Sequence, residues 1–286
     1  KKQYLLHIEN MLVHAGEPAT QARTDAATIY GIEKKLAEAS MGRVERRDPK
    51  KLYHRIELEG LKKLSPKFPW ATYLTGLGFP SITTVNVLTP DFFSGLNKVL
   101  ETTSIADLQT YLRWTLIHGS APLLSKKFVD ENFAFYSQRL TGTAKVLPRW
   151  KRCVSATDRA MGEALGARFA DKVFGRDGKA QAQGIIRGIE AAMAKNLKEL
   201  PWMDDATRKA ALTKLTKIAN KIGFPDKPRD YRTLAVDGNS YLRSALAAHR
   251  FESKRDLTKI GKPLDRGEWL MTAPTVNAYY EPLLNE

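Results

Sequence analysis

Near the end of the chain, one amide side chain interrupts a run of residues that otherwise favours a β-strand, Val276-Asn277-Ala278-Tyr279-Tyr280. Valine and tyrosine suit pleated, half-buried backbone, whereas asparagine is depleted from strands. The Asn277 carboxamide carries both donors and an acceptor, which match the backbone of an extended peptide added alongside as a further strand. The alternative is an ordinary edge strand with a solvated asparagine, and the segment by itself leaves both interpretations open.

The histidines do not have the spacing of a catalytic metal site. Hydrolysis by zinc needs three protein ligands, an open position for water and a general base, and a common solution is His-Glu-x-x-His on one helix. No two of the five histidines are four residues apart, and none precedes a glutamate. We therefore expect no catalytic residue and no metal ligand in this sequence. We expect His7 and His14, which are two helical turns apart, to be surface or packing residues.

The composition is that of a globular chain with an excess of positive charge. Of the 286 residues, 43% are hydrophobic and 27% are charged, and no apolar run approaches the ~20 residues of a membrane-spanning helix. The net charge of +15, from 46 basic and 31 acidic residues, would suit a nucleic acid or an acidic surface. However, the basic residues are scattered among acids and no nucleic-acid-binding motif accompanies them. Solvated helix faces and no nucleic-acid partner are expected.

Apolar residues at helical spacing predict that most of the chain is helical. Ser104 is expected to cap the start of one helix, and Asp204 the start of another. The predicted helices cover residues 20–40, 104–119, 122–142, 150–174, 180–200 and 204–223. Four tryptophans are expected to anchor the core: Trp70, Trp150, Trp202 and Trp269.

Two segments have strand character, residues 81–88 and 269–280. Pro274 cannot donate to a ladder, so the second segment is expected to be an edge strand or a bulge. The fold class is therefore expected to be mainly α, with a helical domain over residues 1–258 and the opening strands of a second domain over 259–286. So short a second domain cannot hold its own core, and further sequence or another chain is expected to complete it.

Six short motifs, in a fixed order, resemble those of one protein family. They are Arg47-Asp48-Pro49 with Leu52-Tyr53, Pro148-Arg149-Trp150-Lys151-Arg152-Cys153, Trp202-Met203-Asp204 with Thr207, Ile222-Gly223-Phe224-Pro225-Asp226, Glu268-Trp269 and Asn277-Ala278. Together they span nearly the whole chain. Each motif is weak, but the ordered set resembles the neprilysin and endothelin-converting enzyme family of zinc metallopeptidases.

The resemblance implies a fold, an activity and a location. It implies that residues 1–258 belong to a helical lid domain and that 259–286 open a thermolysin-like α+β catalytic domain. The intact protein would be a zinc metalloendopeptidase or oligopeptidase that cleaves short peptides, secreted or periplasmic. Its zinc ligands and general base are expected beyond Glu286, so the chain resembles an internal segment whose partners are a peptide substrate and the remaining C-terminal catalytic segment.

The resemblance also implies roles for three residues. The Asn277 side chain and the Ala278 backbone are expected to hydrogen-bond the substrate backbone. Tyr279 is expected to line the subsite before the cleaved bond, with packing on the sheet as its alternative role. Strand alternation places Tyr280 on the opposite face, and we expect it in the core.

The single cysteine, Cys153, has two interpretations. It is either a small buried hydrophobic residue or, as the resemblance implies, one half of a disulfide whose partner precedes Lys1. Two other functions for the whole chain stay open: a catalytically inactive relative that captures peptides, and a basic helical binding module.

Overall fold

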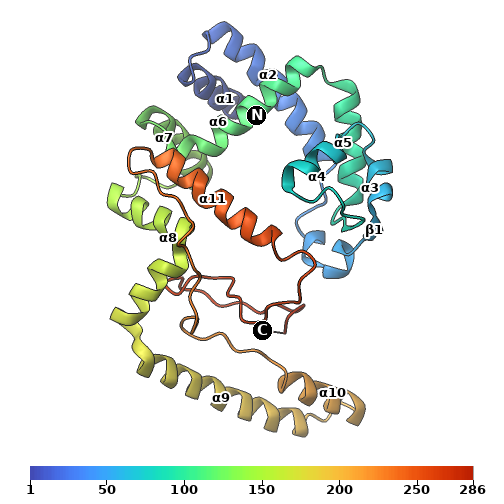
Figure 1. Ribbon diagram of the computed structural model, residues 1–286, viewed down its shortest axis with the longest axis vertical. Coiled ribbons are helices and arrows are strands. Elements are labelled where there is room, and N and C mark those ends of the chain that lie inside the picture. Colours follow the sequence, from blue (N-terminus) through green and yellow to red (C-terminus); the bar gives the residue numbers. More distant parts are fainter. Residues whose placement is uncertain (286) are drawn as a thin grey trace. The chain divides into compact units, whose positions relative to one another are not determined.

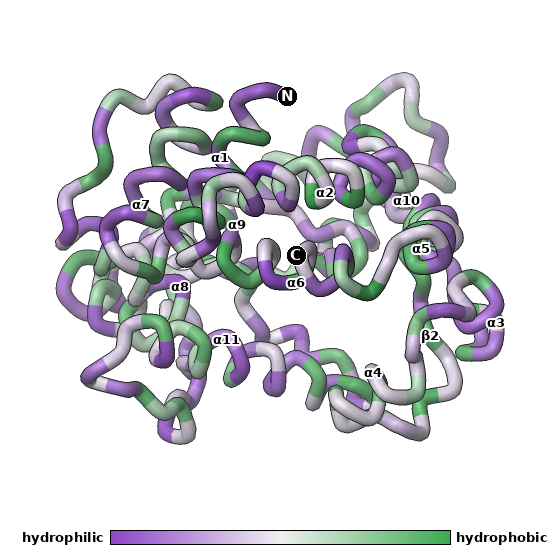
Figure 2. Tube along the Cα trace, turned by 90° about the horizontal axis from the view of Figure 1, so that it is seen from above, coloured by the Kyte–Doolittle hydropathy of each residue, from purple (hydrophilic) through white to green (hydrophobic). Residues whose placement is uncertain are grey.

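Helices dominate the computed structural model, which describes residues 1–285. The chain divides into two compact units, Lys1–Val146 and Leu147–Glu286. In both units, hydrophobic and hydrophilic residues alternate along the helices (Figure 2), as expected for helices that bury one face. The predicted mainly α fold is confirmed. The boundary predicted between residues 258 and 259 stays a prediction.

The first unit is built around four packed helices (Figure 1): α1 (Lys2–His14), α2 (Ala19–Glu38), α6 (Ile105–Ser120) and α7 (Lys126–Asn132). A π-helix (Phe133–Arg139) continues α7. Ser104 caps α6 as predicted, because its Oγ accepts from the Asp107 backbone N–H at 3.1 Å. The core of this unit consists of Ile8, Met11, Leu12, Ala22, Ala26, Ile29, Trp114, Ala121 and Phe128.

A second, smaller core lies under a strand pair. The strands β1 (Arg55–Glu57) and β2 (Thr84–Asn86) are antiparallel, with Ile56 opposite Val85. The strand predicted within residues 81–88 is therefore present, although it is short. Leu61, Trp70 and Val87 form the buried centre. The neighbouring elements are two 3₁₀ turns (Glu45–Arg47 and Pro49–Leu52), α3 (Leu58–Leu64), α4 (Trp70–Leu77) and α5 (Pro90–Thr102). A further 3₁₀ turn (Ala121–Leu123) lies between α6 and α7 and contributes Ala121 to the first core.

The second unit consists of helices and a long tail. The helices are α8 (Arg149–Phe169), a π-helix (Ala170–Phe174), α9 (Gly175–Glu199), α10 (Asp205–Leu215) and α11 (Tyr241–Leu257). Asp204 caps α10 as predicted, with its carboxylate accepting from Thr207 N at 2.7 Å. Within the described residues, no helix of either unit is long and apolar enough to cross a membrane.

The strand expected over residues 269–280 does not form a ladder, and the described part of the second unit contains no strand. A strand requires a partner for its backbone hydrogen bonds, and Pro274 removes one donor. Two of the predicted core tryptophans are also exposed: Trp150 is 65% and Trp202 is 73% accessible. Trp269 is half-buried, whereas Trp70 is buried as expected.

A cluster of polar and aromatic side chains lies inside the first unit. His7 is buried, stacks on Phe135 and pairs its Nδ1 with Glu131 at 2.9 Å. His118 stacks on Trp114, whose indole N–H donates to Glu33 at 3.0 Å. His7 is thus a packing residue, one of the two roles that the sequence suggested. Tyr4 also donates to Glu33, at 2.7 Å, so both half-buried carboxylates, Glu33 and Glu131, are hydrogen-bonded.

This cluster favours neutral histidines. Burial lowers the pKa of His7, although Glu131 opposes the shift, and burial also lowers the pKa of His118 against a smaller opposing effect of Glu33. In the structure, His7 Nε2 and His118 Nδ1 are buried without a hydrogen-bond partner. A proton added to either ring would therefore lack solvation in the fold, whereas the unfolded chain accepts it near pH 6.5.

We predict that acidification destabilises the first unit. Because the folded pKa values lie below the unfolded ones, the stabilisation is complete above about pH 6.5 and is lost as the pH falls from there toward the folded values. Thermal unfolding followed between pH 7.5 and pH 5 should show a falling Tm, and His118→Phe should flatten the decline. The matched change at the exposed His249, His249→Phe, should leave it unaltered. Parallel pH profiles for wild type and His118→Phe would contradict this account.

Candidate substrate-binding segment

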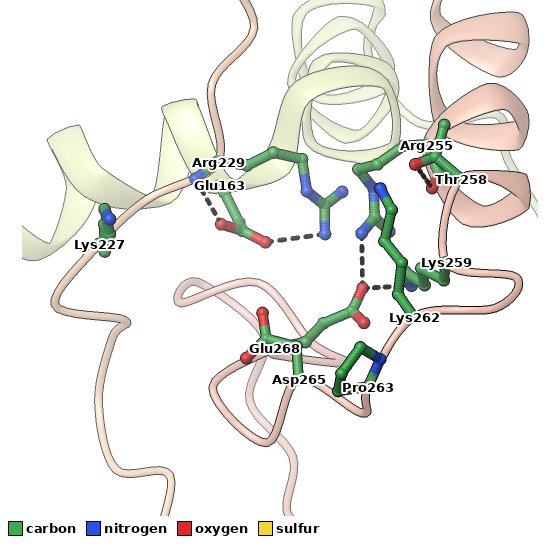
Figure 3. A pocket seen from close by; sticks show the side chains of 10 residues that line it. All are labelled: Glu163, Lys227, Arg229, Arg255, Thr258, Lys259, Lys262, Pro263, Asp265 and Glu268. Atoms are coloured by element: carbon green, nitrogen blue, oxygen red, sulfur yellow. Dashed lines mark hydrogen bonds and ion pairs between the residues drawn. The ribbon is translucent and has the colours of Figure 1, made fainter.

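Within residues 1–285, the tail after α11 contacts the helices of its own unit at three places, and the first is an ion-pair network (Figure 3). The Glu268 carboxylate accepts from Arg255 Nη1 at 2.6 Å and from Lys259 Nζ at 2.7 Å. Burial by itself would raise the pKa of Glu268, but the bonds from Lys259 and Arg255 outweigh burial and hold the pKa below its ordinary value. Glu268 is therefore a charged acceptor that fastens the tail to the end of α11.

The network continues from Arg255 to the other elements of the unit. Arg255 Nε donates to Glu252 at 3.0 Å, and Glu252 accepts from Arg229 Nη1 at 2.8 Å. Arg229 also pairs with Glu163 of α8 at 2.8 Å. Glu163, Arg229 and Arg255 line a cavity of about 300 Å³ together with Glu268 (Figure 3). Each arginine that lines the cavity forms ion pairs with carboxylates. We therefore interpret the cavity as part of the ion-pair network that connects α8, the loop after α10, α11 and the tail.

The second attachment is a close contact between the tail and α8. Thr272 Oγ1 donates to Asp158 Oδ1 at 2.9 Å. Beside this bond, Gly162 and Gly166 are buried on α8. A Cβ on Gly162 would lie 2.3 Å from Thr272 Cγ2, and one on Gly166 would lie 3.3 Å from the Ala273 Cβ. Thr272 and Ala273 of the tail thus occupy space that side chains at these two positions of α8 would fill.

The third attachment lies beyond the predicted site, at the end of α10. Asn285 Nδ2 donates to the Lys214 carbonyl at 3.1 Å, and Ala219 N donates to the Asn285 carbonyl at 2.9 Å. The Tyr280 hydroxyl donates to Asn285 Oδ1 at 3.0 Å. Lys214 Nζ lies 5.3 Å from the centroid of the Tyr280 ring, which is a cation–π distance.

The residues predicted to bind substrate lie together on the stretch between the second and third attachments. Asn277, Ala278 and Tyr279 are all exposed. Asn277 Oδ1 accepts from Ala278 N at 2.8 Å, and Asn277 N donates to the Thr275 carbonyl at 3.0 Å. The prediction that Tyr280 is a core residue is wrong, because Tyr280 is 49% exposed. The prediction assumed a strand with one face on a core, and this segment does not form a strand.

The residues that hold this segment were not identified from the sequence. Asp158 and Thr272 are 114 positions apart, and no local pattern connects them. The four-residue spacing of Gly162 and Gly166 on one helix was the available signal, since such glycines allow another backbone to approach closely. Cys153 is exposed, so its interpretation as a buried hydrophobic residue is wrong, and the disulfide stays a prediction.

The described residues do not offer a zinc site. Among residues 1–285, no group of three or more His, Cys, Asp or Glu side chains is placed to hold a metal ion. His7 and His118 are instead packed among aromatic rings of the first unit.

Comparison with known proteins identifies the family. The family model described as Peptidase family M13 matches residues 1–225. The chain belongs to peptidase family M13. Its relatives include an endothelin-converting enzyme homolog of Locusta migratoria, 31% identical over 99% of this chain and 41% of that protein. Human endothelin-converting enzyme 1 is also 31% identical, over 99% of this chain and 38% of that protein.

Solved structures agree with this family assignment. The inhibitor complex of the Mycobacterium tuberculosis zinc metalloprotease Zmp1 is 34% identical, with a TM-score of 0.91 over 99% of this chain and 43% of that one. PepO from Lactobacillus rhamnosis, at 20% identity, shares the fold with a TM-score of 0.86. The predicted resemblance is thus confirmed. The M13 chain spans about 40% of the length of the curated relatives it matches.

We predict that Glu268 contributes to stability through its charge. In Glu268→Gln, the tail keeps its shape but loses the charge-assisted bonds to Arg255 and Lys259, which should lower the free energy of unfolding by about 1–2 kcal/mol. Because the folded pKa of Glu268 is lowered, its contribution is present above the ordinary glutamate pKa and disappears as the pH falls through the folded value.

Urea denaturation of wild type and variant at pH 7 and pH 3.5 measures this contribution. The two proteins should differ at pH 7 and approach each other at pH 3.5. Glu199→Gln, at an exposed position at the end of α9, is the control and should stay close to wild type. An equal difference at both pH values would contradict a role for the carboxylate charge.

Proposed function

We propose that the protein containing this chain is a zinc-dependent metalloendopeptidase or oligopeptidase that cleaves short peptides. The membership in family M13 and the zinc metalloprotease Zmp1 among its structural neighbours support this activity. In this proposal, the chain supplies the helical lid that limits substrate size and the segment that binds the substrate backbone. The zinc ligands and the general base come from the remaining C-terminal catalytic segment, and the protein acts in a secreted or periplasmic location.

The observation that carries the binding role is the placement of Asn277, Ala278 and Tyr279. All three are exposed, yet both flanks of this stretch are fastened to helices of the same unit. A segment held in this way loses little additional freedom when a peptide binds, and this lowers the entropic cost of association. A loosely attached loop with the same residues would have to be ordered at each binding event.

Each residue has a defined role in the proposal. The Asn277 amino group donates to a carbonyl of the peptide, and the backbone of Ala278 bonds to the peptide in the manner of an added strand. Tyr279 lines the subsite before the cleaved bond. Strand addition is compatible with the absence of a β-ladder in the described part of this unit, because the substrate would then supply the neighbouring strand.

The first prediction of this proposal concerns Asn277. In the full-length protein, Asn277→Ala should lower kcat/KM for a short peptide by about 30- to 150-fold, which corresponds to about 2–3 kcal/mol for an orienting hydrogen bond whose partner is left unpaired. Zinc content, measured by atomic absorption, and Tm should stay unchanged. Asn239→Ala, in an exposed loop of the same unit, is the control and should keep wild-type kinetics. Wild-type turnover by Asn277→Ala would refute the assigned role.

The second prediction concerns substrate size. A helical lid should admit a flexible decapeptide and exclude the same sequence when it is embedded in a surface loop of a folded protein. Mass spectrometry of both digests at matched concentrations measures the difference, and cleavage of the decapeptide should be at least about 100-fold faster. A denatured sample of the same substrate protein controls for the cleavage sequence. Equal rates for the decapeptide and the folded protein would contradict a size-limiting lid.

A further inference from the structure

The proposed binding segment depends on a contact between the tail and α8, a helix that is far from it in the sequence. Thr272 lies five residues before Asn277, and its side chain lies against α8 at Gly162. The helix is interrupted at the neighbouring residue, Met161, whose backbone angles (φ −150°, ψ 47°) are not helical. The tail therefore meets α8 where its two helical pieces join.

Hydrogen bonds connect this contact to the binding segment without a gap. Asp158 accepts from Thr272 Oγ1 at 2.9 Å, and the hydroxyls of Thr272 and Thr275 are 3.0 Å apart. The Thr275 N–H donates to the Thr272 carbonyl at 3.0 Å, which closes a turn, and the Asn277 N–H donates to the Thr275 carbonyl at 3.0 Å. A continuous series of hydrogen bonds thus determines the position of the Asn277 backbone relative to α8.

The close contact with Gly162 determines the distance between this turn and α8. Because Gly162 has no Cβ, the Thr272 methyl group occupies the space where one would be, 2.3 Å from that position. Non-bonded carbon atoms need roughly 3.5–4.0 Å, so any side chain at residue 162 would displace Thr272 by more than about 1 Å. The Asp158 bond fixes the direction of the turn, while the missing Cβ fixes its distance from α8.

We propose that Asp158, Gly162 and Thr272 are positioning residues that set the geometry of the substrate-binding segment Asn277–Tyr279. This inference rests on the proposed function, since it assigns these three residues to the same peptide site. They do not touch the substrate. They act through Thr275 on the Asn277 backbone, and a shift of about 1 Å in a group that orients a substrate can reduce the rate by about 100-fold.

The decisive experiment is a substitution with its matched rescue in the full-length protein. Gly162→Ala adds the one carbon that Thr272 excludes, and we expect kcat/KM for the decapeptide to fall by about 10- to 100-fold. Thr272→Ser removes the methyl group that conflicts with the added carbon and keeps the hydroxyl for Asp158, and its own kcat/KM is the reference for the rescue. The double variant Gly162→Ala/Thr272→Ser should recover activity to within about threefold.

A control variant, a stability measurement and a second test variant separate an effect on positioning from an effect on general stability. Gly188→Ala, at a position on α9 where an added Cβ meets nothing within 4 Å, should be fully active. Alanine favours helix over glycine, so a loss of activity in Gly162→Ala without a loss of Tm indicates positioning. Asp158→Ala, which removes the acceptor without adding bulk, should lower kcat/KM by about 3- to 10-fold and tests the inference even if Gly162→Ala does not fold.

Hydrogen exchange provides a readout that does not depend on peptidase activity. The amides of Thr275 and Asn277 should exchange faster in Gly162→Ala and in Asp158→Ala, and the double variant should restore their protection. Unchanged exchange and full activity in both single variants would overturn the inference. If Asn277→Ala is fully active while the exchange result holds, the proposed function fails and the positioning contact stands. If Asn277→Ala is impaired while both positioning variants match wild type, this inference fails alone.

Discussion

The close approach of the tail to α8 is the constraint on which the candidate site depends. An exposed stretch of three residues has no core of its own to hold it, so its geometry must come from its flanks. On one side, the missing Cβ of Gly162 and the carboxylate of Asp158 hold Thr272. On the other side, Asn285 joins the end of α10. The candidate binding segment is thus attached to helices on both sides, although it is not part of a sheet.

The steric contact and the ion pairs contribute differently. The steric repulsion between Thr272 and a side chain at position 162 rises steeply as the distance shortens. The close packing at Gly162 therefore allows one position for Thr272. The network around Arg255 and Glu268 is longer in range, partly exposed and dependent on pH and salt. Each of its arginines contacts more than one carboxylate, so the loss of one partner leaves others in place. We interpret the network as the part that stabilises the unit, and the contact at Gly162 as the part that sets position.

Local features of the fold were predictable from the sequence because their causes are local. Ser104 and Asp204 cap helices through bonds to residues three positions ahead. The family assignment was accessible for a related reason: short motifs in a fixed order identify a relative without any knowledge of the packing. The residues Asn277, Ala278 and Tyr279 came from that resemblance, and the structure places them together on one exposed stretch.

Features that depend on distant partners were not predictable. The composition of residues 269–280 favours a strand, but a ladder needs a neighbour, and the described residues of this unit provide none. Trp150 and Trp202 are exposed although tryptophan is usually buried, whereas Trp114 forms the core with residues of α1 and α2. The contact of Asp158 with Thr272 spans 114 positions, and such a pair becomes visible only once α8 and the tail are folded together.

The most direct test of the central claim is a structure of the full-length protein with a bound, uncleavable peptide analogue. The account predicts that the main chain of the peptide runs along residues 277–279, within about 2.9 Å of the Asn277 carboxamide and the Ala278 backbone, with Thr272 still seated against Gly162. A peptide bound elsewhere, with this segment untouched, would contradict it.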